Sequence, residues 1–302
     1  MAVIPQTQLG PSRGGNFEYH WAGPFLEAHL LSDVGKKRQR NEDGCTICVP
    51  EDRELARQSG ILFAVADGMG GVSGGDFASR LGLQTLVEEY YARNEAGAPA
   101  RLSEAVSQAN RRIFQEAENH PEFYGMGTTM CALLVQGDHA YIAHVGDSRL
   151  YLMRQGEGLV QVTEDHSLVA EQVRNGYISE EEARSHSLKN LITRAVGTKD
   201  QVSADLYAVR LKVGDTLMIC SDGLSNLVDD QQIANILAGE NLQGAARVLV
   251  GRALAGGAPD NVTVLLVRVT AQPYKTQMAS GARPITIGKP GFLGALKRMI
   301  SS

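Results

Sequence analysis

Two features that direct proteins out of the cytoplasm are missing from this sequence. No apolar run is long enough to span a bilayer, and the first residues lack the basic-then-apolar order of a signal peptide. Cysteine is scarce, with four in 302 residues, and three of these lie in strand-like runs where a free thiol behaves as a small hydrophobe. We therefore expect a reduced, cytoplasmic protein without a transmembrane segment.

Excess positive charge is also missing. The 29 lysines and arginines are outnumbered by 34 acids, which gives a net charge of -5. A protein that binds nucleic acid through bulk charge needs the opposite balance, so we expect no nucleic-acid partner. The composition, with 43% hydrophobic and 21% charged residues and no internal repeat, is that of a globular protein that can bury a large core.

A second cysteine pair is missing as well. Cys45 and Cys48 form a C-x-x-C motif, but no other pair follows at the spacing of a zinc site. The motif follows acidic residues and does not open a helix, as redox-active pairs do. We therefore expect neither a zinc site nor a redox role.

Short apolar runs divide the chain into expected strands and helices. Residues 1–25 contain several prolines and glycines and are interpreted as a loose N-terminal lead-in. Strand-like runs, a polar hairpin loop at 51–60 and amphipathic helices follow. The expected helices span 75–93, 102–119, 229–237 and 242–255. Polar residues at about 167–195 interrupt the strands and predict an inserted, helical flap.

The residues from 271 onward differ from the rest. They contain Lys275, Arg283, Lys289, Lys297 and Arg298 but no acid. The favoured interpretation of 271–302 is a basic, flexible C-terminal tail. The alternative is that residues 292–300 form a short amphipathic turn that contacts a membrane or a partner.

Five strand-like runs end at an aspartate in a turn, and these residues are Asp43, Asp67, Asp147, Asp222 and Asp260. Any one of them could be a turn former, and Asp67 alone could equally cap the helix that follows it. If the strand ends converge, however, the carboxylates crowd together, which is unfavourable unless cations neutralise them. The repetition therefore favours a metal site.

The ligand types indicate which metal. Carboxylates suit Mg²⁺ or Mn²⁺, as does the Gly68 carbonyl in the glycine-rich turn, and a cluster without His or Cys argues against zinc. Two such ions can hold a bridging water, lower its pKa and neutralise a phosphoryl group. In the basic run at 36–40, Arg38 is the best candidate to grip a phosphate, and Arg40 is the second. These residues predict a metal-dependent phosphohydrolase.

At this point the sequence resembles a known family, the PPM (PP2C-type) serine/threonine protein phosphatases, and in particular its bacterial branch. The resemblance covers about residues 26–270. Its motifs, in chain order, are DVG at 33–35 with Arg38, NED at 41–43, DGMGG at 67–71, GTT at 127–129, GDSR at 146–149, DHS at 165–167, SDGL at 221–224 and DNVT at 260–263. Each motif is weak alone, but the ordered set is specific.

The resemblance implies an α+β fold, the PP2C-like four-layer α-β-β-α sandwich, with two antiparallel sheets flanked by helices. The phosphatase domain would span 26–270, with the flap at about 167–195 beside the site. Two Mn²⁺ or Mg²⁺ ions would lie at one end of the sandwich.

Motif matching also assigns the metal ligands. Asp43 and Asp67, with the Gly68 carbonyl, would bind the first ion or bridge the two. Asp222 and Asp260 would bind the second ion.

Other residues match supporting roles in the family. Arg38 matches the phosphate-binding arginine, which places it in the catalytic machinery with Asp43 and Asp67. Glu42 would orient bound water from behind the ligands, and Asn261 would support the same layer.

Asp147 matches a ligand of a third, weaker metal in bacterial members.

Two departures from the family pattern bear on the chemistry. Many members have Asp where this chain has Asn226, so we expect weaker occupancy of the third position. Animal members have a proposed acid, His, where this chain has Met69, so the leaving-group proton must come from bound water or another group.

For four further residues we favour interpretations without a catalytic role. His166 could shuttle protons, but a structural role in a turn is preferred. Arg149 is expected to form a structural ion pair near Asp147. Ser148 and Ser221 are not nucleophile candidates, because no Gly-x-Ser-x-Gly elbow or paired base accompanies them.

The favoured function is hydrolysis of phosphoserine and phosphothreonine on proteins by a water that bridges two metal ions, without a phosphoenzyme. The expected partners are phosphoproteins made by a bacterial serine/threonine kinase. The alternative is a non-catalytic PP2C-like binding or sensing module, which loss of a metal aspartate would mark, yet all four central ones are present. A dedicated phosphatase of anti-sigma-factor antagonists fits less well, because those usually carry sensor domains.

Overall fold

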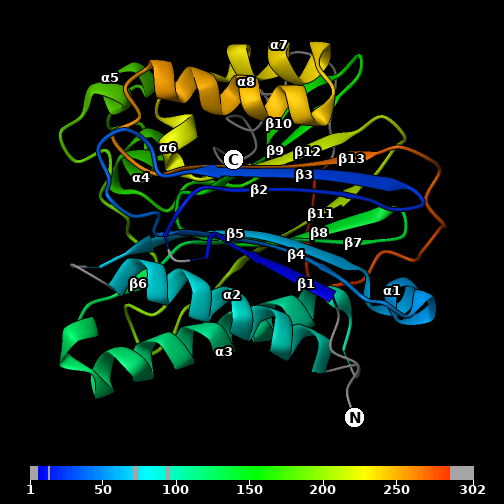
Figure 1. Ribbon diagram of the computed structural model, residues 1–302, viewed down its shortest axis with the longest axis horizontal. Coiled ribbons are helices and arrows are strands. Elements are labelled where there is room, and N and C mark those ends of the chain that lie inside the picture. Colours follow the sequence, from blue (N-terminus) through cyan, green and yellow to red (C-terminus); the bar gives the residue numbers. More distant parts are fainter. Residues whose placement is uncertain (1–5, 13, 71–73, 93–95, 286–302) are drawn as a thin grey trace.

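The computed structural model of the chain describes residues 6–12, 14–70, 74–92 and 96–285. Its elements form four layers, with two sheets face to face in the middle (Figure 1). Helices α2 (Gly74–Ala92) and α3 (Ala98–Asn119) cover one sheet, and α7 (Asp230–Gly239) and α8 (Leu242–Ala255) cover the other. The expected α-β-β-α sandwich is confirmed.

The sheet beside α2 and α3 has the strand order β1-β4-β5-β7-β8-β11-β14, and β6 pairs with β5. Its neighbouring strands are antiparallel, except for β11 and β14, which run parallel. The strands are β1 (Gln6–Gly10), β4 (Asp43–Val49), β5 (Ile61–Met69), β6 (Gly127–Thr128), β7 (Met130–Gln136), β8 (His139–Val145), β11 (Asp205–Arg210) and β14 (Arg283–Ile285).

The sheet beside α7 and α8 is antiparallel throughout, in the order β10-β9-β12-β13-β3-β2. Its strands are β2 (Phe17–Ala22), β3 (Leu26–Asp33), β9 (Arg149–Arg154), β10 (Gly158–Gln161), β12 (Thr216–Cys220) and β13 (Val262–Val269).

Because side chains alternate along each central strand, each strand contributes residues to two separate cores. In β5, Phe63 and Val65 face the opposite sheet, whereas Leu62 and Ala64 face the helices α2 and α3. All four are fully buried, and burial of a large apolar side chain such as Phe63 stabilises the fold by about 1.5–3 kcal/mol. The two cores pack against both faces of the strands whose ends carry the candidate site.

The same alternation separates the two thiols of the C-x-x-C motif in β4. Cys45 belongs to the core between the sheets, and Cys48 belongs to the core under α2 and α3. Both are buried and free, and burial raises the pKa of Cys48 to about 11. Thiols on opposite faces of one strand cannot ligate one metal ion or form a local redox pair.

The expected loose lead-in over 1–25 is wrong for its described part. β1 pairs with β4 in one sheet, and β2 pairs with β3 in the other. In β2 the aromatic residues Phe17, Tyr19 and Trp21 alternate with smaller or polar ones and pack against the core between the sheets. This period-two pattern was hidden by the prolines and glycines around it.

Two further expectations are corrected. The predicted loop at 51–60 contains helix α1 (Arg53–Ser59), which begins where the Asp52 side chain accepts a hydrogen bond from the Leu55 amide at 2.8 Å. The predicted flexible tail contains β14, so residues 271–285 are part of the fold. Residues 286–302, which include the proposed amphipathic turn at 292–300, lie outside the described residues.

The predicted flap is helical, as expected. It contains α4 (Leu168–Arg174) and α5 (Glu180–Ser185), each capped at its N-terminus by a serine, Ser167 or Ser179. The short helices η1 (Pro121–Phe123) and α6 (Asp222–Ser225) complete the described elements, and α6 directly follows β12.

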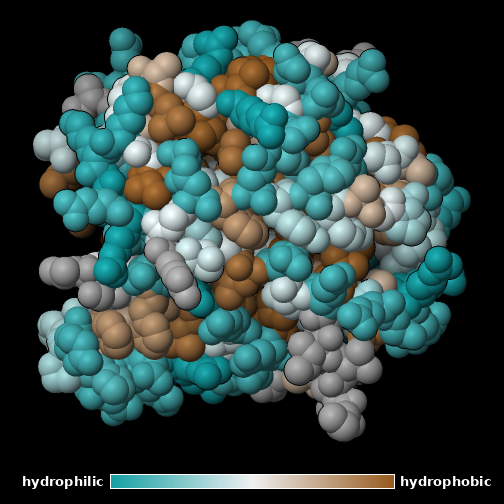
Figure 2. Space-filling model, viewed as in Figure 1, coloured by the Kyte–Doolittle hydropathy of each residue, from teal (hydrophilic) through white to brown (hydrophobic). Residues whose placement is uncertain are grey.

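Hydrophilic side chains cover most of the face in Figure 2, with hydrophobic ones scattered between them. None of the helices in the described part of the chain combines the length and the hydropathy that a bilayer crossing needs.

Candidate metal centre and phosphate site

Four of the predicted aspartates meet where strands of both sheets end. Asp43 begins β4 and lies directly opposite Asp67 in the antiparallel pairing of β4 with β5. Asp222 begins α6 immediately after β12, and Asp260 lies just before β13, the strand that pairs with β12. Each sheet therefore contributes two aspartates to the same end of the sandwich.

Close backbone approaches bring these segments together. A Cβ atom at Gly223 would lie 1.9 Å from the carbonyl oxygen of Asn261, so only glycine fits between Asp222 and the Asp260 turn. A Cβ atom at Gly68 would lie 2.0 Å from the carbonyl oxygen of Gly75, at the start of α2. The glycines of the motifs thus permit the convergence of the acids.

The Asp43 carboxylate is held by two hydroxyl groups from the other sheet. Its Oδ2 atom accepts hydrogen bonds from Ser221 Oγ at 2.8 Å and from Thr263 Oγ1 at 2.6 Å. These bonds use only Oδ2, so Oδ1 is the oxygen that can bind a cation. Burial raises the pKa of Asp43 to about 7, and the charges of Asp222 and Asp260 add to this shift although both hydroxyls oppose it.

The other carboxylates show the same crowding. Burial raises the pKa of Asp67 well above its usual range, and Asp43, Asp222 and Asp147 raise it further. The pKa of Asp222 is also raised, first by burial and then by Asp260. Buried carboxylates that destabilise each other's charge fit a cation site, and an all-oxygen set suits Mg²⁺ or Mn²⁺.

The carboxylates fit Mg²⁺ or Mn²⁺ by the chemical type of their ligand atoms, which are all oxygens. Among the described residues, no group of three or more His, Cys, Asp and Glu side chains is placed so that it could hold a metal ion as it stands. The carboxylates line one site from several sides, and the Gly68 carbonyl belongs to the same strand end as Asp67.

Arg38 lies between two of the predicted site acids. Its guanidinium donates hydrogen bonds to Glu42 Oε2 at 3.0 Å and to Asp260 Oδ2 at 2.8 Å. The side chain is 45% exposed, so it can also reach a ligand in solvent. Arg40, the second candidate, is exposed, and only its backbone carbonyl joins this network. The geometry therefore favours Arg38 as the phosphate ligand.

Asn261 joins the two loops that carry the acids. Its Oδ1 accepts a hydrogen bond from the Glu42 amide at 2.8 Å. Its Nδ2 donates to the carbonyl oxygens of Val34 at 2.8 Å and Arg40 at 2.9 Å. The buried amide thus supports Glu42 and the Arg38 loop from behind, as its predicted position implies.

Asp147 lies in the turn between β8 and β9 and is only 8% exposed. Its Oδ1 atom is buried and has no hydrogen-bond partner among the described residues, and burial, Asp222 and Asp165 raise its pKa well above the usual range. An orphaned buried carboxylate oxygen next to the central acids fits the predicted third ligand. Asn226 donates to Asp222 Oδ2 at 3.0 Å, so it contacts a central acid.

His166 has the structural role that we favoured. The Gly146 amide donates to His166 Nδ1 at 3.0 Å, so the proton is on Nε2, which lies 3.1 Å from Asp205 Oδ2. Burial lowers the pKa of this histidine. One ring nitrogen therefore holds the turn that carries Asp147, and the other binds Asp205 at the start of β11.

Arg149 forms the expected structural ion pair, and its partner is Asp165. The guanidinium makes three hydrogen bonds to this carboxylate, the shortest at 2.7 Å. Met69 pairs with Gly127 where β5 meets β6.

The hydroxyl network around Asp43 was missed from the sequence. Ser221 was considered only as a nucleophile, whereas it donates to Asp43. Thr263 Oγ1 also lies 2.7 Å from Ser32 Oγ, which accepts a hydrogen bond from Asn41 Nδ2 at 2.8 Å. The sequence contained one signal for this network, because a small polar residue stands directly beside each of three motif aspartates.

Comparisons with known proteins identify the family. The profile of the family described as protein phosphatase 2C matches residues 36–245. A serine/threonine phosphatase, Stp, from Listeria innocua is 37% identical over 248 residues, which cover 80% of this chain and 95% of that protein. The serine/threonine protein phosphatase PstP from Mycobacterium tuberculosis is 38% identical over 245 residues, covering 80% of this chain and 45% of that protein.

Solved structures are similar over the same region. Stp1 from Staphylococcus aureus, a serine/threonine phosphatase, superposes with a TM-score of 0.76 at 34% identity, covering 82% of this chain and 97% of that one. The catalytic domain of PstP in complex with two manganese ions superposes with a TM-score of 0.71 at 36% identity, covering 82% of this chain and 99% of that one.

Proposed function

The chain belongs to the protein phosphatase 2C family and is a metal-dependent serine/threonine protein phosphatase, and from this premise we propose which residues carry the reaction. Asp43 and Asp67, with the Gly68 carbonyl, hold one Mn²⁺ or Mg²⁺ ion, and Asp222 and Asp260 hold the second. When bound, such a pair acidifies a water and neutralises phosphoryl charge. Asp147 contributes to a weaker third position.

The chain's own residues orient the phosphate. Arg38 binds two phosphate oxygens through its guanidinium, which Glu42 and Asp260 aim into the site. Ser221 and Thr263 fix the Asp43 carboxylate so that one oxygen stays directed at the cation. Met69 carries no titratable proton, so this side chain does not protonate the leaving alkoxide. Ser221 does not take the phosphoryl group, since its hydroxyl is already used to hold Asp43.

The observation that carries this proposal is the convergence of four aspartates from two sheets under an arginine that two acids hold in place. We infer that the substrates are phosphoserine and phosphothreonine proteins made by a serine/threonine kinase in the cytoplasm. The folded unit that does this work extends beyond the expected 26–270, since β1, β2 and β14 complete its sheets. Contact of the basic tail, residues 271–302, with a membrane or partner is a separate expectation, which unchanged localisation and unchanged partners after its deletion would dismiss.

The test is hydrolysis of a phosphothreonine peptide by the purified protein with EDTA, Mg²⁺ or Mn²⁺. We expect activity that requires metal and is lost in Asp222→Asn. The matched control is Asp229→Asn, because Asn caps α7 as well as Asp does and this residue lies outside the cluster. A folded protein without activity with any metal would favour the non-catalytic binding module.

A further inference from the structure

Residues 271–285, which we call the strap, lie beyond the matched family region, and their last residues form β14, the outer strand of the sheet next to β11. At its start, the Tyr274 hydroxyl donates to the Arg57 carbonyl in α1 at 2.9 Å, and the Arg57 guanidinium lies 5.2 Å from the Tyr274 ring centre. The strap is thus fixed at one end to α1.

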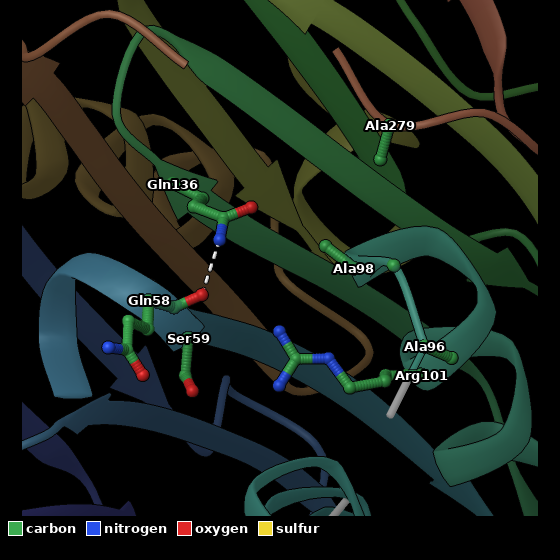
Figure 3. A pocket seen from close by; sticks show the side chains of 8 residues that line it. Gln58, Ser59, Ala96, Ala98, Arg101, Gln136 and Ala279 are labelled. Carbon is green, nitrogen blue, oxygen red and sulfur yellow. Dashed lines mark hydrogen bonds between the residues drawn. The ribbon is translucent and has the colours of Figure 1, made fainter. Parts of the chain in front are cut away.

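The middle of the strap follows the hairpin between β7 and β8. The Thr276 amide donates to Asp138 Oδ1 at 2.8 Å, and the Ala279 amide donates to the Tyr141 hydroxyl at 2.9 Å. Ala279 also forms one wall of a cavity of about 240 Å³, opposite Gln58 and facing Ala98 at the start of α3 (Figure 3). The strap therefore packs on the body of the protein over its whole length.

The end of the strap reaches the other end of the sheet. β14 pairs in parallel with β11, with Arg283 opposite Tyr207. Arg283 donates to Glu164 Oε1 at 3.1 Å, and its guanidinium lies 5.5 Å from the centre of the Tyr207 ring. Glu164 is the first residue of the segment from which the flap leaves the sandwich.

This segment, residues 164–167, is the flap root, and it is tied to the site. The Glu164 carbonyl accepts a hydrogen bond from His144 Nε2 at 3.1 Å. His166 bonds to the Gly146 turn that carries Asp147, and to Asp205 at the start of β11. β11 therefore contacts both segments: its outer side pairs with the strap, and Asp205 at its start binds the flap root.

We propose that the strap positions the flap: by pairing with β11 and holding Glu164, residues 283–285 fix the flap root and thereby set the affinity of the enzyme for a phosphoprotein. A small phosphate ester that does not reach the flap is hydrolysed independently of the strap. The effect on substrate rests on the proposed function, whereas the effect on flap mobility does not.

The test compares four forms of the whole protein. They are a truncation after Thr270, a truncation after Ile285 that keeps the strap, Arg283→Glu, and Arg283→Glu combined with Glu164→Arg. Hydrogen exchange of residues 164–195 is measured first, without metal or substrate. We expect about tenfold faster exchange after truncation at Thr270 and a smaller increase in Arg283→Glu. The truncation at Ile285 should match the full chain, and the charge-exchanged pair should recover its protection.

Kinetics supply the second measurement. Truncation at Thr270 should raise KM for a phosphothreonine protein by about fivefold, with kcat/KM for p-nitrophenyl phosphate within about twofold of the full chain. Unchanged exchange of residues 164–195 in both Arg283→Glu and the Thr270 truncation overturns the proposal. If that truncation does not fold, the charge-exchanged pair decides, because failure to recover protection overturns it equally. Failure of the full chain to hydrolyse either substrate would refute the proposed function while the exchange result still tests the strap.

Discussion

The guanidinium of Arg38 is 2.8 Å from the carboxylate of Asp260, the acid that we assign to the second metal ion. The same arginine is our phosphate ligand, so the cation and the phosphate both compete with this ion pair. If a cation binds Asp260 as we propose, it would weaken the hold of this carboxylate on Arg38 and make donors of the guanidinium available to the substrate. We therefore expect the pair to couple cation binding to phosphate binding.

Removal of this arginine should impair substrate use. Arg38→Ala removes charge-assisted hydrogen bonds to phosphate, and we expect kcat/KM for a phosphothreonine peptide to fall about 10- to 100-fold. The matched control is Arg40→Ala, since Arg40 is exposed nearby and only its carbonyl is bonded in the site. Steady-state kinetics at saturating Mn²⁺ measures both, and equal losses in the two variants would contradict the assignment.

The hydroxyl groups on Asp43 should control metal affinity. Replacing both donors, Ser221→Ala with Thr263→Val, leaves the carboxylate free to turn, and we expect apparent Mn²⁺ affinity to fall about 10- to 100-fold. Thr46→Val is the control, because this buried hydroxyl of the same strand donates to the Gln8 carbonyl and not to an acid. The measurement is Mn²⁺ binding by calorimetry, and unchanged affinity in the double variant would show that the donors are dispensable.

Metal removal should destabilise the fold less in a variant with one acid fewer. Cation at about 100 times its dissociation constant stabilises the native state by about 2.7 kcal/mol, so EDTA should lower Tm. Asp222→Asn removes a charge that its neighbours oppose, so its metal-free Tm should equal or exceed that of the wild type, while its gain with Mn²⁺ shrinks. Thermal unfolding with EDTA and with Mn²⁺ measures both effects, and an undiminished Mn²⁺ gain would be inconsistent with ligation by Asp222.

The third metal position should be weak. Asn226 offers no charge next to Asp222, so we expect a Mn²⁺ titration to give two tight sites and a distinctly weaker third. Asn226→Asp should tighten the third step. Three tight sites in the wild type would contradict this expectation.

Acid should destabilise the protein through His144. Burial, and next the charge of His166, lower the pKa of this histidine from 6.5 to about 4. The unfolded chain therefore takes up the proton first, so the stability contribution is complete above pH 6.5 and is lost as the pH falls toward 4. At pH 5 the loss is about 2 kcal/mol. Urea unfolding at pH 7.5 and pH 5 measures it, and His144→Gln should lack this part of the pH dependence.

Local patterns were enough to predict the aspartates and the layers, but the contacts between distant segments were not predictable. Asp67 and Asp222 each end an apolar strand beside glycine, which is a local signal. That Ser221 and Thr263 donate to Asp43 depends on how two sheets are stacked, and no local pattern contains this. β1 and β14 were missed for the same reason, since each is short and is stabilised as a strand by a partner far away in the chain.

The proline in β14 has a consequence for the protein at high concentration. Without this strand, β11 would present a row of unpaired amide and carbonyl groups on an apolar sheet, which is a template for another chain. Pro284 lies in the outer strand and has no amide hydrogen to offer, and the exposed Arg283 adds charge beside it. We expect chains that lack residues 271–285 to associate through this edge, and the intact protein to resist aggregation when it is crowded.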